Sequence, residues 1–143
     1  MDLGKLDDCI KSGLIRKIEP SKETALKIMS KAVALIAEAK ATLDADAPDA
    51  TVLLAYDAML LSAKALLTKD GFREKSHYCA IVYVEVKYAD TDKIDKNLIK
   101  LFDNYRLVRH MAAYDTDFMM SEKDAKQSVR DAELISAAIS KLI

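Results

Sequence analysis

The chain has 143 residues, a formal net charge of −1 from 22 basic and 23 acidic side chains, and only 3 Gly and 2 Pro. A chain of this length forms one domain with a full core, and its balanced charge argues against a protein that binds nucleic acid along a broad basic face. The scarcity of turn-forming and helix-breaking residues favours an all-helical protein, and charges interrupt the apolar runs, so none approaches the ~20 apolar residues of a membrane span.

The first predicted element is a short helix over about residues 2–12. Its apolar side holds Leu3, Leu6 and Ile10. Gly13 and, later, Pro20 end this helix and begin an irregular connector. We expect residues 1–19 to pack on the rest of the protein as an accessory helix and connector. The N-terminus lacks the basic region followed by an apolar one that marks a signal peptide, which favours a cytoplasmic protein without membrane contact.

The two cysteines, Cys9 and Cys79, stand far apart in the sequence, and neither belongs to a C-x-x-C pair. This spacing indicates neither a disulfide framework nor a zinc cage. We therefore expect two reduced thiols, as is usual in the cytoplasm, and we expect the protein to hold no metal ion and no cofactor.

Two long helices are predicted next. Ser21 is placed to cap a helix that ends near Asp44. The apolar face of this helix consists of Ala25, Ile28, Ala32, Leu35, Ile36, Ala39 and Leu43. Pro48 suits the first turn of the following helix, which is apolar nearly all round and stops at Gly71, so it should be the most buried element. Tyr56 and Asp57 interrupt that apolar helix. A tyrosine with its hydroxyl at the rim of the core is the ordinary explanation, and a role in a site is the less favoured alternative.

Residues 76–88 carry two conflicting signals. Ser76 can cap a helix. An alternation typical of a half-buried strand is formed by Val82, Val84, Val86 and Tyr88. A lone strand would have no partner in a chain with few other strand candidates, so we expect a helix here.

Two more helices complete the predicted fold. The first runs from Ile94 to Tyr114. Its apolar stripe holds Ile94, Leu98, Leu101, Tyr105, Val108 and Ala112. Ser121 opens a capping box for the last helix, which runs to the C-terminus. Four long helices with short connections predict an all-α, antiparallel (up-down-up-down) four-helix bundle with an additional short N-terminal helix. We expect one domain over residues 1–143, with the bundle core at about 20–143.

Polar side chains gather near the end of the next-to-last predicted helix. Arg106 lies three positions before Arg109 and four before His110, so all three can reach one patch beside the apolar stripe and hold an anion there. The ordinary alternative is that each arginine lays its stem over the core and keeps its charged end in water. His77 is interpreted as a hydrogen-bonding residue at a helix start, because with Cys79 it offers only two metal ligands.

Three segments of the chain resemble the HEPN domain, a small helical bundle named for its occurrence in higher eukaryotes and prokaryotes and for suspected nucleotide binding. Residues 55–67 are similar to the family's pattern of an aromatic, small residues and a closing Ala-Leu-Leu. Residues 75–78 resemble the Lys-Ser-His that opens the next helix in many small prokaryotic members, and residues 109–115 resemble the family's R-x-x-A-x-Y-D. Together the three segments extend the resemblance over roughly residues 20–140.

The resemblance implies a homodimer in which the polar motifs of both subunits face a shared cleft. It also implies a minimal nucleotidyltransferase as a partner, the pair acting as a toxin–antitoxin module, and metal-independent RNA cleavage by the catalytic members. Those members carry an arginine followed, after four to six intervening residues, by a histidine. Here three residues separate Arg106 from His110, and Ala112 stands two before Tyr114, where catalytic relatives tend to place histidine. The departure favours a non-catalytic or weakly catalytic binding module.

Three functions follow for the polar residues. In the first, Arg109 and Arg106 hold a phosphate of RNA or of a nucleotide, and Tyr114 and Asp115 complete the site. In the second, a metal-independent ribonuclease toxin uses His110 for proton transfer and the arginines for the phosphate, while Tyr114 or Asp115 orients the histidine. In the third, Arg109 pairs with Asp115 or another acid across a two-fold axis, and the protein is only a dimeric antitoxin or assembly partner.

Overall fold

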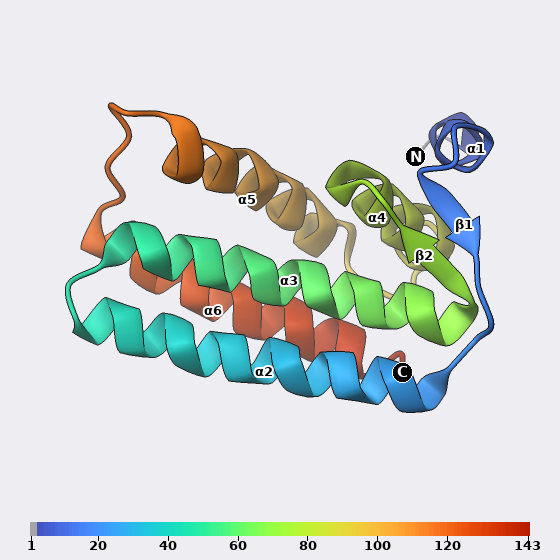
Figure 1. The fold of residues 1–143 in the computed structure, drawn as a ribbon, viewed down its shortest axis with the longest axis horizontal. Coiled ribbons are helices and arrows are strands. Elements are labelled where there is room, and N and C mark those ends of the chain that lie inside the picture. The colour runs from blue at the N-terminus through green and yellow to red at the C-terminus, as the bar shows by residue number, and fades with distance from the viewer. Residues whose placement is uncertain (1–2) are drawn as a thin grey trace.

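The computed structural model describes residues 3–143, apart from the side chain of Leu3, and is 75% helical. Its elements in chain order are α1 (Leu3–Lys11), β1 (Ile15–Lys17), α2 (Lys22–Asp44), α3 (Pro48–Asp70), β2 (Phe72–Glu74), α4 (His77–Val84), η1 (Glu85–Ala89), α5 (Lys96–Tyr114) and α6 (Glu122–Ser140). Six helices pack together beside a small two-stranded sheet (Figure 1). The prediction of a helical bundle with an extra N-terminal helix is confirmed.

The helix boundaries follow from local capping. The hydroxyls of Ser21, Ser76 and Ser121 each accept a hydrogen bond from the backbone N–H three residues on, at 3.1, 3.2 and 3.1 Å. Each bond satisfies an N–H that the first turn of a helix leaves without a partner. Pro48 occupies the first turn of α3, and Gly71 ends α3 in the left-handed conformation with φ of 92°.

Helix α3 is the centre of the fold. It contacts α2, α4, α5 and α6, and in Figure 1 it runs between α2 and α5. Within residues 3–143 it alone is long and apolar enough to cross a membrane by length and composition, so the expectation that no stretch approaches this is wrong. In this fold 61% of its most apolar window is buried inside the protein, as expected for a helix that is apolar on all sides and surrounded by others.

Strands β1 and β2 pair antiparallel, with Arg16 opposite Arg73. This pair corrects the expectation of an irregular connector and adds a small sheet to the predicted helical bundle. Strands of three residues are too short to show an alternating pattern in the sequence. The chain enters β2 through Gly71, where a Cβ atom would lie 2.7 Å from Cγ of Pro20. Only glycine therefore allows this close approach in this backbone conformation.

Cys9 and Cys79 form a disulfide bond, with their Cα atoms 5.9 Å apart. The prediction of two reduced thiols is therefore wrong, because the β1–β2 pair returns α1 to the side of α4 (Figure 1). Helix α1 turns Leu6 and Cys9 inward, whereas Ile10 is 46% exposed, contrary to expectation, and the side chain of Leu3 lies outside the described part. The cytoplasmic location, which depended partly on reduced thiols, stays a prediction.

Residues 77–89 are helical, as predicted, and end in the π-helical turn η1. The alternation that resembled a strand does not mark one buried and one exposed face, because Val82, Tyr83 and Val84 are buried one after another. A helix that is covered on all sides shows no helical periodicity in its sequence, so pattern alone could not have identified it.

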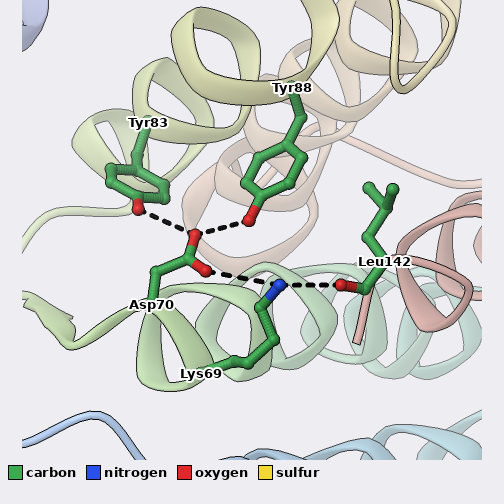
Figure 2. A network of polar contacts seen from close by, with 5 residues as sticks. All are labelled: Lys69, Asp70, Tyr83, Tyr88 and Leu142. Carbon is green, nitrogen blue, oxygen red and sulfur yellow. Dashed lines mark hydrogen bonds and ion pairs between the residues drawn. The ribbon is translucent and has the colours of Figure 1, made fainter.

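The end of this helical segment is tied to α3 by a polar cluster, shown in Figure 2 and called here the tyrosine network. Its members are Lys69, Asp70, Tyr83, Tyr88 and Leu142. Oδ2 of Asp70 accepts hydrogen bonds from the hydroxyls of Tyr83 and Tyr88, at 2.8 and 2.6 Å. Nζ of Lys69 lies 3.4 Å from Oδ1 of Asp70 and donates to the carbonyl of Leu142 at 2.8 Å. The network joins α3, α4, η1 and the C-terminus.

Helix α5 turns a wider face to the core than predicted. Of the predicted stripe, Ile94 and Tyr105 are buried, and Leu98, Leu101, Val108 and Ala112 are partly buried against the core. Ile99 and Phe102, which lie outside that stripe, are buried as well. The difference arises because α5 packs against α3 and α4 as well as α6, which requires a wider apolar surface than one stripe. Positions 99, 102, 106 and 109 follow one another at helical spacing, so the arginines continue a face that begins as core.

Candidate functional site

A cleft of about 440 Å³ lies between the start of α4 and the second half of α5. Its walls are formed by Ser76, His77, Tyr78, Arg106, Leu107, Arg109 and His110. The structure thus brings three of the residues singled out in the sequence, Arg106, Arg109 and His110, to one concave surface. It adds the first residues of α4, which the Ser76 cap holds in place.

Arg109 carries a buried hydrogen-bond donor that has no acceptor. Its side chain is partly buried, and its Nε atom is buried without a hydrogen-bond partner. Leaving a buried donor unpaired costs about 1–3 kcal/mol, and more when the group is charged. Side chains in this position are usually completed by a bound ligand or by water. Arg109 is therefore the residue of the cleft most in need of an acceptor.

Asp57 of α3 lies near Arg109 and His77. Burial raises the pKa of the Asp57 carboxyl above its usual value, and the charges of Arg109 and His77 act in the opposite direction. Asp57 thus places a partly buried carboxyl behind the cleft, where its charge offsets part of that of Arg109.

His77 is fixed from behind by Tyr56. Nδ1 of His77 and the hydroxyl of Tyr56 lie 3.2 Å apart, at hydrogen-bonding distance, and the tautomer of the imidazole decides which of them donates. Tyr56 is fully buried and its ring also contacts Phe102, with 6.0 Å between ring centroids. Burial raises the pKa of Tyr56, so its hydroxyl stays protonated. Burial and the charge of Arg109 lower the pKa of His77, which favours a neutral imidazole.

Arg106 has a partner within the protein. Its Nε donates to Oδ1 of Asp103 at 2.8 Å, and its guanidinium carbon lies 5.2 Å from the centre of the Tyr78 ring. Both contacts hold the guanidinium at the edge of the cleft. Because Asp103 neutralises part of its charge, Arg106 attracts an anion less strongly than Arg109 does.

The remaining predicted residues lie away from this centre. His110 is exposed on the rim and packs against Tyr114, with 4.9 Å between ring centroids. Tyr114 is 67% exposed and does not line the cleft. Asp115 follows the last turn of α5, where its Oδ1 accepts a hydrogen bond from the N–H of Asp117 at 2.9 Å. The structure therefore brings neither Tyr114 nor Asp115 to Arg109.

The sequence interpretation gave Tyr56 and Asp57 a site role only as the less favoured alternative, and gave His77 only a local role. One signal for the first two was present, since Tyr56 and Asp57 are polar residues inside a helix that is apolar nearly all round. Buried polar side chains in such a helix need partners. What the sequence could not show is that their surroundings include His77 from α4 and Arg109 from α5.

The arrangement provides guanidinium donors and two imidazoles around one concavity, and the buried phenol of Tyr56 contacts one of these imidazoles. A group with several acceptor oxygens and a negative charge fits these donors best, because arginine gives two parallel hydrogen bonds to a phosphate or carboxylate. Within residues 3–143, no three or more His, Cys, Asp or Glu side chains gather as a metal ion would require.

Comparison with known proteins gives the family of the chain. A family model described as the HEPN domain matches residues 25–142, from the first turn of α2 to two residues beyond the end of α6. No match among the curated proteins was found. HEPN domains are RNA-targeting domains that often occur in toxin–antitoxin pairs, and they commonly dimerise and pair with nucleotidyltransferases. Because the match covers most of the chain and agrees with the helical fold, the protein belongs to the HEPN domain family.

Proposed function

We propose that this HEPN domain is a binding module, non-catalytic or weakly catalytic, whose cleft holds a phosphate of RNA or of a nucleotide. The observation that carries the proposal is the buried Nε of Arg109, which has no hydrogen-bond partner at the wall of a concave site. A phosphate oxygen would supply the missing acceptor. Arginine suits this task because its planar group stays charged and donates two parallel hydrogen bonds.

The proposed contact between the cleft and RNA involves few phosphates. Asp57 lies near Arg109, Asp103 bonds Arg106, and the whole chain carries a formal charge of −1. The cleft is therefore a local cationic point and not part of a long basic groove. If two phosphates of a single strand are neutralised, the logarithm of the binding constant should fall with the logarithm of salt concentration with a slope of roughly −1.4.

The proposal includes a homodimer and a minimal nucleotidyltransferase partner in a toxin–antitoxin-like system, with a cytoplasmic location. Support for the dimer comes from the outer face of α5, where Leu107, Met111 and Tyr114 are 52%, 39% and 67% exposed. These residues follow one another at helical spacing, and Leu107 also lines the cleft. A second subunit on this face would cover apolar surface and bring the two clefts near each other.

Binding of a fluorescently labelled single-stranded RNA, followed by anisotropy, tests the proposal. Arg109→Ala should raise Kd by at least about tenfold, because it removes a charge-assisted bidentate contact. Arg130→Ala is the matched control, since it removes the same charge from an exposed position of α6 outside the cleft. Equal affinity of the wild type and Arg109→Ala would overturn the proposal. A variant that binds RNA normally but no longer dimerises would assign Arg109 to assembly instead.

A further inference from the structure

We propose that a second pocket, between α1, α4 and α5, is a subsite for a guanine base, and that Glu85 recognises the edge of this base. The inference deepens the proposed function and rests on it, since the base belongs to the nucleotide whose phosphate lies on Arg109. It concerns which nucleotide is preferred, whereas the cleft itself concerns only the phosphate.

The pocket, called here the base pocket, has a volume of about 380 Å³. Its floor is apolar, because Ile81, Val82 and Ile99 line it and are nearly fully buried. Ligand pockets typically combine such an apolar surface with a small number of polar groups that fix orientation. A flat ring with a polar edge, such as a nucleobase, can lay its faces on this floor and turn its edge to the rim.

The base pocket lies beside the cleft. Tyr78 lines both, and Arg106, which lines the cleft, donates to Asp103, which lines the base pocket. Arg109 and Asp103 are six positions apart on α5, which corresponds to about 9 Å along the helix axis. One nucleotide can span this distance, with its phosphate on Arg109 and its base in the base pocket. The exposed ring of Tyr78 lies at the boundary, where a ribose or a base can pack against it.

Glu85 is a carboxylate on the rim of the base pocket that lacks a donor. Its side chain is partly buried, and within residues 3–143 no hydrogen bond or ion pair reaches its carboxylate. Asp103, by contrast, already accepts from Arg106. Burial raises the pKa of Glu85, and nearby carboxylates act in the same direction. Donors from a ligand would therefore stabilise the charged form of Glu85.

Guanine is the RNA base that fits this carboxylate. A carboxylate only accepts hydrogen bonds, and its two oxygens can take two parallel donors. Guanine carries two adjacent donors, N1–H and the N2 amine. Adenine and cytosine offer one amine beside a ring nitrogen that accepts, and uracil offers one N–H between two carbonyls, so each sets an acceptor against the second oxygen. Lys5 and Lys100 on the rim are donors that suit the guanine carbonyl, which lies next to N1–H.

Helix α1 supplies one wall of the base pocket, and the disulfide holds this helix in place. Lys5 lines the pocket from α1, and Cys9, one turn later on the same helix, is bonded to Cys79 of α4. Helix α1 precedes residues 25–142, which the family model matches. Recognition of the base is therefore a property that this chain adds to the cleft and that does not follow from its family.

Binding of fluorescently labelled oligoadenosine strands that differ at one central nucleotide tests the inference. This nucleotide is guanosine, inosine or adenosine, and inosine lacks only the N2 amine of guanosine. Anisotropy gives Kd for each strand with the wild type, Glu85→Gln, Arg109→Ala and Glu38→Gln. Glu38→Gln is the matched control, at an exposed position of α2 outside the base pocket. Circular dichroism melting shows that each variant is folded.

We expect the wild type to bind the guanosine strand about tenfold more tightly than the inosine strand, because inosine lacks one donor to a charged acceptor. The adenosine strand should bind no better than the inosine strand. In Glu85→Gln the ratio of the two Kd values should fall to within about twofold, whereas Glu38→Gln should keep it. The ratio is the readout because the loss of a negative charge strengthens binding of every strand.

Two further measurements separate the base from the phosphate and from its source. Arg109→Ala should weaken binding of all three strands and leave the guanosine preference in place. Unlabelled guanosine and inosine monophosphates are then added as competitors to the wild type. A guanosine monophosphate that displaces the strand better than inosine monophosphate would show that the free nucleotide is recognised, whereas a preference seen only in strands would identify an RNA base as the ligand.

Three results would contradict the inference. Equal Kd values of the wild type for the guanosine and inosine strands would overturn the base pocket and leave the phosphate-binding proposal standing. A guanosine preference that survives unchanged in Glu85→Gln would reject Glu85 as the residue that recognises the base. A wild type that binds none of the strands would contradict the proposed function itself.

Discussion

The start and the end of the helical segment formed by α4 and η1 differ in whether their buried polar groups have hydrogen-bond partners. At its end, the tyrosine network surrounds the Asp70 carboxylate with two phenol hydroxyls and the ammonium group of Lys69. At its start, the cleft contains a guanidinium whose buried Nε has no partner. The network is complete in the protein alone, so it serves to hold helices together. The cleft leaves one buried donor without an acceptor, and in the proposed function a ligand supplies that acceptor.

The Cys9–Cys79 disulfide fixes the start of α4, beside the cleft, and its removal should have the largest effect on stability. Cys9→Ser should lower the free energy of unfolding by about 4 kcal/mol, because the bond closes a loop of about 70 residues in the unfolded chain. Urea unfolding with and without a reducing agent measures this, and reduced wild type should match the variant. An equal stability of oxidised and reduced protein would contradict the prediction.

The tyrosine network should respond next most strongly. Asp70→Ala leaves the hydroxyls of Tyr83 and Tyr88 without their acceptor, and we expect a loss of about 3 kcal/mol, from two hydrogen bonds to a charged group. Asp44→Ala, at an exposed position of α2, is the control and should change stability by less than about 0.5 kcal/mol. RNA affinity per folded molecule should not change. If Asp70→Ala changed the free energy of RNA binding more than the free energy of unfolding, the tyrosine network and the cleft would not be independent.

A substitution in the cleft should instead raise stability and lower RNA affinity. Arg109→Met removes a buried donor that has no partner and keeps a side chain of similar length, so stability should rise by about 1 kcal/mol while RNA affinity falls. Thermal unfolding monitored by circular dichroism, beside the anisotropy assay, measures both. A variant that is markedly less stable than wild type would show that Arg109 holds the fold together and would remove the contrast.

The smallest effect concerns pH. Because the pKa of His77 is lowered in the folded state, the unfolded chain binds this proton more readily, and stability should fall as pH drops through the ordinary range of histidine near 6.5. Solvent exposure of the ring keeps the effect under about 1 kcal/mol. The raised pKa of Asp57 acts with the opposite sign at lower pH, where folding favours the protonated carboxyl. His77→Gln should abolish the first slope and leave the second.

The parts of the fold that could be predicted are those that depend on neighbouring residues. Ser21, Pro48, Gly71, Ser76 and Ser121 act on backbone groups within one turn, so the helix boundaries were visible in the sequence. The β1–β2 pair and the disulfide join segments far apart in the chain, and no local pattern records them. For the same reason the cluster of polar residues on α5 was recognised, whereas the contribution of α3 and α4 to the cleft was not.

The π turn at η1 has a consequence for the length of the chain. Positions five apart on a regular α-helix point about 140° away from each other, yet Tyr83 and Tyr88 both reach one oxygen of Asp70. The wider turn over Glu85–Ala89 is what brings them to one side. Removing the exposed Lys87 would make an ordinary α-helix with the tyrosines four apart, which also share a face. This helix can therefore differ by one residue in length between related proteins and still keep both hydroxyls on the same carboxylate.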